Sequence, residues 1–253
     1  MISASGVEKR FGGANGLLAL DGVSINIAEG EFVSLLGPSG CGKSTFLRCL
    51  ASLEKPTGGT LLIDGAPVDG PPKGLGMAFQ RDALLDWFNV IENVLLPADF
   101  AGARKRDFEP RAQELLAMVG LREFAQVYPR ALSGGMRQRV AMCRSLLLDP
   151  RLLLMDEPFG ALDALTRDQL NVDFHHLCAQ RRVTVVFVTH SIAEAVFLSQ
   201  RIVVFSPRPG RVVEDITVDL PPERRLALRD TPEFAEYTRR VRTIFERMGL
   251  IHD

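Results

Sequence analysis

The stretch Leu-Leu-Gly-Pro-Ser-Gly-Cys-Gly-Lys-Ser-Thr, residues 35–45, constrains the fold of this chain more than any other segment. It follows the apolar run 32–36, which predicts a short buried strand, and it leads into 43–53, whose spacing predicts a helix. Glycines let backbone N–H groups approach phosphate oxygens with no Cβ in the way, and a following helix directs its positive end at the same anion. The segment therefore predicts a phosphate-binding loop rather than a chance glycine turn.

Further apolar runs alternate with helical patterns along the chain. Strands are predicted at 59–65, 74–80, 151–158 and 183–190, with two late strands in Arg-Ile-Val-Val-Phe-Ser-Pro and Gly-Arg-Val-Val-Glu-Asp-Ile-Thr-Val-Asp-Leu. This alternation predicts an α/β fold with a mainly parallel sheet. Because ligands bind at the carboxyl ends of such strands, we expect the phosphate loop, residues 156–157 and His190 to meet at one edge.

Two carboxylates end the buried run Leu-Leu-Leu-Met-Asp-Glu. Asp156 suits a water-mediated ligand of Mg²⁺, and Glu157 suits a general base for an attacking water. On their own they could equally be solvated acids at a strand end. Beside a phosphate loop they indicate nucleotide hydrolysis. The guanine-reading pattern Asn-Lys-x-Asp is absent from the sequence, which argues against a GTPase.

A second segment, Leu-Ser-Gly-Gly-Met-Arg-Gln-Arg at 132–139, also combines a hydroxyl, glycines and a helix start. Ser133 can cap the helix, and Gly134 and Gly135 leave backbone N–H groups open to an anion. An ordinary capped helix is the plainer interpretation. We call each such combination of glycines and a helix start a glycine cradle: the phosphate loop is the first, and residues 132–139 are the second. One nucleotide rarely needs two glycine cradles, so the sequence raises the question of which molecule binds at the second.

Composition excludes several classes of function. The chain carries 30 basic and 31 acidic side chains, a net charge of −1, so nucleic acid is not expected as a partner. Its four cysteines lack a Cys-x-x-Cys pair or a Cys/His spacing, so structural zinc is not expected. No apolar run approaches the roughly 18–20 residues that span a bilayer.

Taken together, these segments resemble an ATP-binding-cassette (ABC) ATPase. The phosphate loop is similar to the Walker A motif of that family, Leu-Leu-Leu-Met-Asp-Glu to its Walker B motif, and residues 132–139 to its signature. Gln80 resembles the family's Q-loop residue, Asp163 in Gly-Ala-Leu-Asp its D-loop residue, and His190 its switch histidine. The resemblance implies ATP as ligand, bound by Phe11, Gly37, Pro38, Ser39, Gly40, Cys41, Gly42, Lys43, Ser44 and Thr45.

The resemblance also implies how these residues act. Glu157, His190 and Gln80 would be catalytic, and Mg²⁺ would be held by Ser44, Gln80 and Asp156. In this family two subunits meet head to tail, so the signature residues would serve the nucleotide of the partner copy. Those residues are Ser133, Gly134, Gly135 and Gln138. Phe11 stands where a tyrosine is common, and stacking on adenine survives that change.

The family fold implies one ABC ATPase domain over residues 1–253, a P-loop NTPase fold with a mainly parallel core sheet, an antiparallel β subdomain and a helical insertion. The core with the antiparallel subdomain would comprise 1–88 and 150–220, and the helical subdomain with the signature would comprise 89–149. Residues 221–253 would form a C-terminal helical extension. Its apolar residues recur at helical spacing, which favours packing on its own domain over a regulatory or dimer contact.

Three further segments, beginning Met-Asp-Glu-Pro, Ser-Pro-Arg-Pro and Arg-Asp-Thr-Pro, resemble ATPase subunits of nitrate, sulfonate and taurine importers. The implied machine has two ATPases, two transmembrane permease subunits and an extracytoplasmic substrate-binding protein. The chain would then lie peripherally on the cytoplasmic face of the membrane. Alternatives are an ABC ATPase outside transport, an importer of an unrelated solute, or a nucleotide-binding regulator without activity.

The segment 81–94 follows Gln80 directly and holds the single tryptophan, Trp87. Its apolar residues either belong to the core or line a groove for a short helix of the transmembrane subunit. In the second case Asp86, which stands where the importer subgroup often has proline, would pair with a basic residue of that partner. The sequence leaves both interpretations open.

Overall fold

The fold is organised around a six-stranded sheet in the computed structural model, which describes residues 1–13 and 16–251. Its strand order is β10-β9-β3-β8-β7-β6, and all neighbouring strands are parallel except the edge pair β10 and β9. The strands are β3 (Phe32–Leu36), β6 (Leu75–Ala78), β7 (Leu152–Asp156), β8 (Thr184–Thr189), β9 (Arg201–Phe205) and β10 (Val212–Thr217). The predicted α/β fold with a mainly parallel core sheet is confirmed.

The central strands are apolar throughout because both faces of this sheet are covered. In β3, Phe32 and Leu36 contribute to one apolar core while Val33 and Leu35 contribute to the other. Side chains alternate across a strand, so a strand covered on both faces shows a continuous apolar run. The sheet therefore separates two hydrophobic cores.

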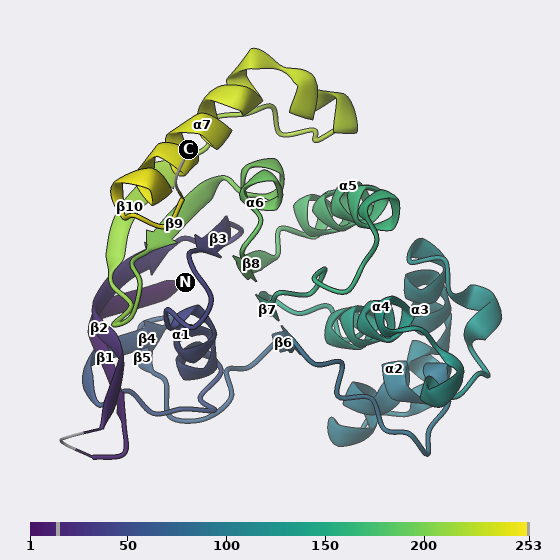
Figure 1. Cartoon of the computed structure of the whole chain (residues 1–253). Coiled ribbons are helices and arrows are strands. Elements are labelled where there is room, and N and C mark those ends of the chain that lie inside the picture. Colours follow the sequence, from purple (N-terminus) through teal and green to yellow (C-terminus); the bar gives the residue numbers. More distant parts are fainter. Residues whose placement is uncertain (14–15, 252–253) are drawn as a thin grey trace.

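A second sheet covers one of these faces together with helix α1 (Figure 1). It is antiparallel, in the order β2-β1-β4-β5. Its strands are β1 (Ile2–Phe11), β2 (Leu17–Ile27), β4 (Gly58–Ile63) and β5 (Ala66–Pro67). The first two alternate buried and exposed residues, as expected for a sheet with one solvated face.

Helices cover the other face and extend to one side of the molecule (Figure 1). Helix α1 (Lys43–Leu50) belongs to the first face. The helices of the other face are α2 (Val90–Phe100), α3 (Lys105–Met118), α4 (Gly134–Leu146), α5 (Ala164–Arg181), α6 (Ile192–Leu198) and α7 (Pro232–Arg247), with 3₁₀ turns η1 (Arg122–Phe124), η2 (Pro129–Ala131) and η3 (Leu226–Asp230). Helices α2, α3 and α4 form a separate group beyond β6, within the range predicted to be a helical insertion. Across the described residues, no helix is long and apolar enough to cross a membrane.

Helix α7 packs against the domain, which agrees with the plainer interpretation of the C-terminal segment. Phe234, Val241, Ile244 and Phe245 are buried and belong to the same apolar core as α5 and α6. These residues lie on one side of the helix at spacings of three and four, the arrangement of an amphipathic surface helix. The last two residues of the predicted 221–253 extension lie outside the described part of the chain.

Candidate functional site

The phosphate loop connects β3 to α1, as the sequence predicts. Gly40 and Gly42 have φ of 74° and 108°, in the region that favours glycine. A Cβ on Gly42 would lie 2.6 Å from the carbonyl oxygen of Ala19, and one on Gly37 would lie 2.9 Å from that of Phe205. The backbone conformation thus favours glycine at 40, close packing requires it at 37, and both reasons apply at 42.

Lys43 begins α1 and is only 4% exposed. Its Nζ donates to the carbonyl oxygens of Gly37 at 2.7 Å and Pro38 at 2.9 Å. A buried ammonium group needs such partners, because desolvation without them is costly. The phosphate loop therefore surrounds the ammonium group of Lys43, which lies next to the N-terminus of α1.

Ser44 and Asp156 meet across the site although 112 residues separate them. The Ser44 hydroxyl donates to Oδ1 of Asp156 at 2.7 Å. Burial raises the pKa of the Asp156 carboxyl, the Ser44 hydrogen bond lowers it and the charge of Glu157 raises it. Hydroxyl and carboxylate oxygens are the donors that Mg²⁺ prefers, so this pair fits the metal predicted from the sequence.

Glu157 lies between the two other residues predicted to be catalytic, Gln80 and His190. Its Oε2 is 3.3 Å from Nε2 of Gln80 and 3.4 Å from Nδ1 of His190. The three side chains follow β6, β7 and β8, so the parallel sheet brings together three residues that are far apart in sequence. Glu157 has φ of 49°, and its backbone N–H donates to the Val188 carbonyl at 3.0 Å, which fixes this strained turn.

A cavity of about 330 Å³ borders the phosphate loop, Gln80 and Glu157, whereas His190 is not among its lining residues. Its lining consists of Phe11, Leu17, Ala19, Ser39, Gly40, Cys41, Gly42, Lys43, Ser44, Thr45, Gln80, Glu157 and Arg208. Phe11 lies at the end of β1, and the Nζ of Lys9 lies 4.8 Å from its ring centroid. The aromatic side chain predicted to stack on adenine therefore borders the same cavity as the phosphate loop.

Arg208 is a residue of this cavity that the sequence reasoning missed. It follows β9, and its Nε donates to the carbonyl oxygen of Gly40 at 3.1 Å. The side chain thus brings a second cation to the phosphate loop. A basic residue just beyond the carboxyl end of a core strand is the signal that could have identified it.

The signature segment lies apart from this cavity. Ser133 caps α4, and its Oγ accepts from the Met136 N–H at 3.3 Å, as predicted. Ser133 and Gly134 are exposed, and neither borders the cavity of the phosphate loop. Gly134 instead borders a second hollow of about 520 Å³. Within the described residues, the second cradle opens outward rather than onto the chain's own phosphate loop.

Gln138 and Asp163 flank this cradle in different ways. Gln138 is only 9% exposed, its Nε2 donates to the Gln80 carbonyl at 3.3 Å, and its Oε1 accepts from the Ala161 N–H at 3.0 Å. Its side chain is thus bonded inside its own chain, unlike Ser133 and Gly134. Asp163 caps α5, and the hydrogen bond from Thr166 lowers the pKa of this exposed carboxyl.

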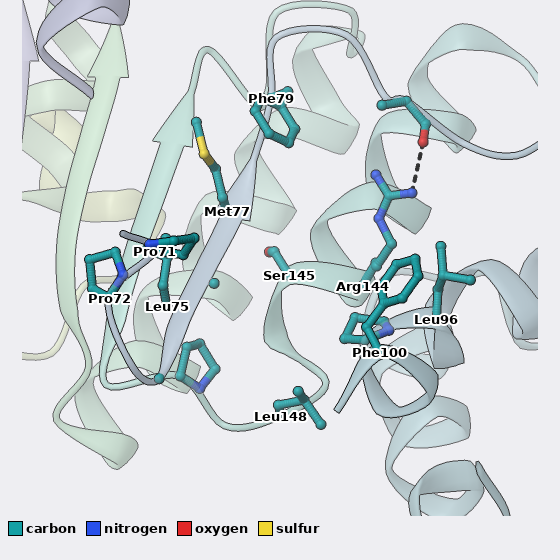
Figure 2. A pocket seen from close by; sticks show the side chains of 15 residues that line it. Pro71, Pro72, Leu75, Met77, Phe79, Leu96, Phe100, Arg144, Ser145 and Leu148 are labelled. Carbon is teal, nitrogen blue, oxygen red and sulfur yellow. Dashed lines mark hydrogen bonds between the residues drawn. The ribbon is translucent and has the colours of Figure 1, made fainter. Parts of the chain in front are cut away.

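An apolar groove of about 740 Å³ begins one residue before Gln80 (Figure 2). It runs between β6 and helices α2 and α4, and its aromatic side chains are Phe79 and Phe100. Phe100 is 82% exposed. Arg144 also lines the groove, and its Nη1 donates to the Ala83 carbonyl at 2.8 Å.

The groove is not where the sequence reasoning expected it, because none of residues 84–88 lines it. Trp87 is 70% exposed, so its interpretation as a core residue is wrong. Asp86 is exposed and lies 3.7 Å from Arg130 of its own chain. The chain turns away from the groove after Ala83, whose positive φ of 47° marks the turn.

Comparison with known proteins agrees with this geometry. The ABC transporter family model matches residues 20–160. A taurine import ATP-binding protein of Rhizobium johnstonii is 47% identical over 233 residues, which cover 89% of this chain and 88% of that protein. A nitrate import ATP-binding protein of Synechocystis sp. is 39% identical over 244 residues, covering 94% and 92%.

Solved structures agree as well. The bacterial ABC transporter cassette MJ0796, solved as a dimer, is 35% identical, with a TM-score of 0.79 over 87% of this chain and all of that chain. A post-hydrolysis state of the same cassette, bound to ADP and Pi, is 34% identical with the same TM-score. Since the family model spans more than half of the chain and the relatives cover most of it, the chain belongs to the ABC transporter family, as one of its ATPases.

Proposed function

We propose that this ATPase powers an importer for a small solute of the nitrate, sulfonate or taurine class. Its relatives include taurine, nitrate and aliphatic sulfonate import ATP-binding proteins, and the sulfonate protein of Bacillus cereus is 39% identical over 99% of this chain. The observation that carries the ATPase assignment is the Glu157 carboxylate, which lies between Gln80 and His190 at the cavity of the phosphate loop. The solute itself never reaches this site.

In the proposed mechanism Lys43 and the loop N–H groups bind the phosphates, and Phe11 orients the base. Glu157 accepts a proton from the attacking water, which Gln80 helps to position, and His190 contacts the terminal phosphate. Bound Mg²⁺ would neutralise phosphate charge, held by the oxygens of Ser44, Gln80 and Asp156. The 2.7 Å contact between the Ser44 hydroxyl and Asp156 supports that assignment.

The active unit is proposed to be a head-to-tail homodimer. Ser133, Gly134 and Gly135 would bind the γ-phosphate held by the partner's phosphate loop, and Asp163 would lie at the same interface. Support comes from the exposure of Ser133 and Gly134 and from their separation from the chain's own nucleotide cavity. The related cassette MJ0796 was solved as a dimer.

The transmembrane permease subunits are proposed to dock a short apolar helix in the groove of Figure 2. The groove starts beside Gln80, so a group bound there is one residue away from the nucleotide site. Exposed apolar surface with aromatic anchors is typical of such contacts. The complete importer would also contain a substrate-binding protein, and the ATPase would lie on the cytoplasmic face of the membrane.

Hydrolysis by the purified chain tests the enzymatic half of the proposal. We expect ATP hydrolysis that requires Mg²⁺ and that Lys43→Ala abolishes, because the loop then loses its buried cation. Hydrolysis that persists in Lys43→Ala would assign the activity to another site or to a contaminant.

Co-purification from membranes tests the docking half. Phe100→Asp is expected to leave basal hydrolysis intact but to prevent assembly with the permease and uptake of sulfonate or nitrate. Leu53→Asp is the matched control, since Leu53 is 53% exposed but does not line the groove. If the Phe100 variant still co-purifies and supports uptake, the permease binds elsewhere.

A further inference from the structure

Helix α6 carries a buried carboxylate that lies outside the nucleotide cavity. Glu194 is 6% exposed and does not line that cavity. Burial raises the pKa of its carboxyl group, while a hydrogen bond from Thr189 and the charge of Arg167 lower it. Burying a carboxylate is costly unless it is paired and hydrogen-bonded, so its partners indicate what it does.

The first partner lies next to the switch histidine. Thr189, the residue before His190, donates its hydroxyl to Oε2 of Glu194 at 2.6 Å. Ser191, the residue after His190, donates its N–H to the Thr189 hydroxyl at 3.0 Å, and its own hydroxyl accepts from the Glu194 N–H at 3.3 Å. Both neighbours of His190 are therefore tied to Glu194.

This arrangement differs from an ordinary capping box, in which the glutamate accepts directly from the N–H of the cap residue. Here the Thr189 hydroxyl takes the Ser191 N–H and passes the hydrogen bond on to Glu194. The cap at Asn89 shows the ordinary form, because Oε2 of Glu92 accepts from the Asn89 N–H at 2.9 Å. In both caps the glutamate uses Oε2, and in α6 Oε1 of Glu194 has a further partner.

That partner is Arg167 of helix α5. Its Nε lies 3.7 Å from Oε1 of Glu194, and its Nη2 donates to the Leu162 carbonyl at 2.6 Å. The backbone N–H of Arg167 donates to the carbonyl of Asp163 at 2.9 Å, the first helical bond of α5. The guanidinium group of Arg167 therefore contacts both the buried carboxylate of Glu194 and the turn that carries Asp163.

We propose that Glu194 is a positioning residue for His190 and that its pair with Arg167 couples His190 to the turn at 162–163. The inference rests on the proposed role of His190 at the terminal phosphate. The chain of contacts runs from the turn through Arg167, Glu194 and Thr189 to His190, and on to Glu157, whose Oε2 lies 3.4 Å from Nδ1 of His190. A shift of the outward-facing turn then moves the switch histidine.

The test compares Glu194→Gln with the native chain in ATP titrations and hydrolysis assays. Glutamine retains the size of the side chain and an oxygen for Thr189, but its amide cannot pair with Arg167. We expect kcat to fall at least about tenfold with the dissociation constant for ATP unchanged, since a misplacement of about 1 Å can cost about 100-fold in rate. Arg167→Met should have the same effect, and it tests the coupling without altering the carboxylate.

A double-mutant cycle separates positioning from a general loss of structure. In a His190→Ala background, Glu194→Gln should lower kcat no further, because there is no histidine left to position. Glu31→Gln is the matched control: Glu31 is a largely buried carboxylate that lies 3.0 Å from the guanidinium of Arg201, away from the nucleotide cavity, and its replacement should leave kcat unchanged.

Two results would overturn the inference. Unchanged kcat in both Glu194→Gln and Arg167→Met would make the network a helix cap and nothing more. An equal fall in kcat with and without His190 would show that Glu194 acts by another route. Neither result affects the proposed hydrolysis, which fails if the native chain does not hydrolyse ATP or does so independently of Lys43 or Glu157.

Discussion

The two glycine cradles of this protein are built from the same parts but differ in what surrounds them. Each joins glycines to the start of a helix, α1 in the phosphate loop and α4 in the signature. The phosphate loop encloses Lys43, which is 4% exposed. Lys43 lines the same cavity as Gln80 and Glu157. The signature cradle exposes Ser133 and Gly134, and among the described residues no lysine lines its hollow.

The two cradles also differ in the charged side chains that lie beside them. Beside the phosphate loop, Lys43 and Arg208 bring two cations to the cavity that would receive phosphate. Beside the signature, Arg137 and Asp82 neutralise each other at 3.0 Å. The phosphate loop encloses a buried lysine of its own chain, whereas the signature offers backbone N–H groups, a hydroxyl and, across its hollow, Arg81. The signature cradle therefore suits a phosphate that is already bound by the phosphate loop of a second copy of the chain.

The largest expected effect comes from the catalytic residue of the complete cradle. Glu157→Gln should lower kcat by a factor of about 10²–10⁴, the usual loss for a general base, while ATP binding persists. The closed dimer should then accumulate with ATP, which size-exclusion chromatography with light scattering would detect. Asp215→Asn is the control. It also replaces a carboxylate by an amide, but Asp215 lies in the edge strand β10 and pairs with Arg201, so this variant should hydrolyse ATP normally. Native turnover in Glu157→Gln would remove the residue from its proposed role.

Mixing two inactive chains tests whether the second cradle works in trans. Lys43→Ala damages the phosphate loop and Ser133→Arg blocks the signature, so each chain alone should be inactive. In an equal mixture about half of the dimers contain one of each chain, and each of these has one intact composite site. We expect hydrolysis to return to about a quarter of the native level, and a mixture as inactive as its components would argue for sites complete within one chain.

The sequence predicted the phosphate loop, the acids after β7 and the histidine after β8, because each lies in a local pattern of strand, turn and helix. The meeting of Glu157 and His190 followed from the rule for the carboxyl ends of parallel strands, whereas Gln80 was assigned to the site only by the family resemblance. Strands β1 and β2 were not located individually, and the antiparallel sheet was expected only from the family resemblance. Alternation over one solvated face is a weaker signal than a continuous apolar run.

The groove could not be located from sequence, for a physical reason. Residues 84–88 are mostly apolar and follow Gln80 closely in sequence, yet none of them lines the groove, and the chain turns at Ala83 before it reaches them. The groove is instead assembled from β6, α2, α4 and the loop at 71–72, segments that only the tertiary fold brings together. Arg208 was missed in the same way, since its contact with Gly40 spans 168 residues.

A smaller effect is expected from single methyl groups in the signature cradle. A Cβ on Gly134 would meet nothing within 4 Å in its own chain, whereas one on Gly135 would lie 3.0 Å from Leu162. Gly134→Ala should therefore leave thermal stability unchanged or slightly higher, since alanine favours helix by about 0.5–1 kcal/mol. It should nevertheless lower kcat about tenfold, because the methyl group keeps the partner's phosphate from the backbone. Normal hydrolysis in this variant would mean that no ligand approaches Gly134 closely.

The smallest expected effect concerns the second cation of the phosphate loop. Arg208 is exposed, and its Nε is bonded to the Gly40 carbonyl at 3.1 Å, so water screens much of its charge. Exposed charge contacts contribute about 0.2–1 kcal/mol, which corresponds to a rise of up to about fivefold in KM for ATP when Arg208 becomes alanine. The kcat value should stay within about twofold, because Arg208 makes no contact with Glu157 or His190. Arg240→Ala, which removes an equally exposed arginine from α7, is the control. Should KM remain native in Arg208→Ala and change with salt no differently from the control, the phosphate loop would bind its anion with Lys43 and the loop N–H groups, without help from Arg208.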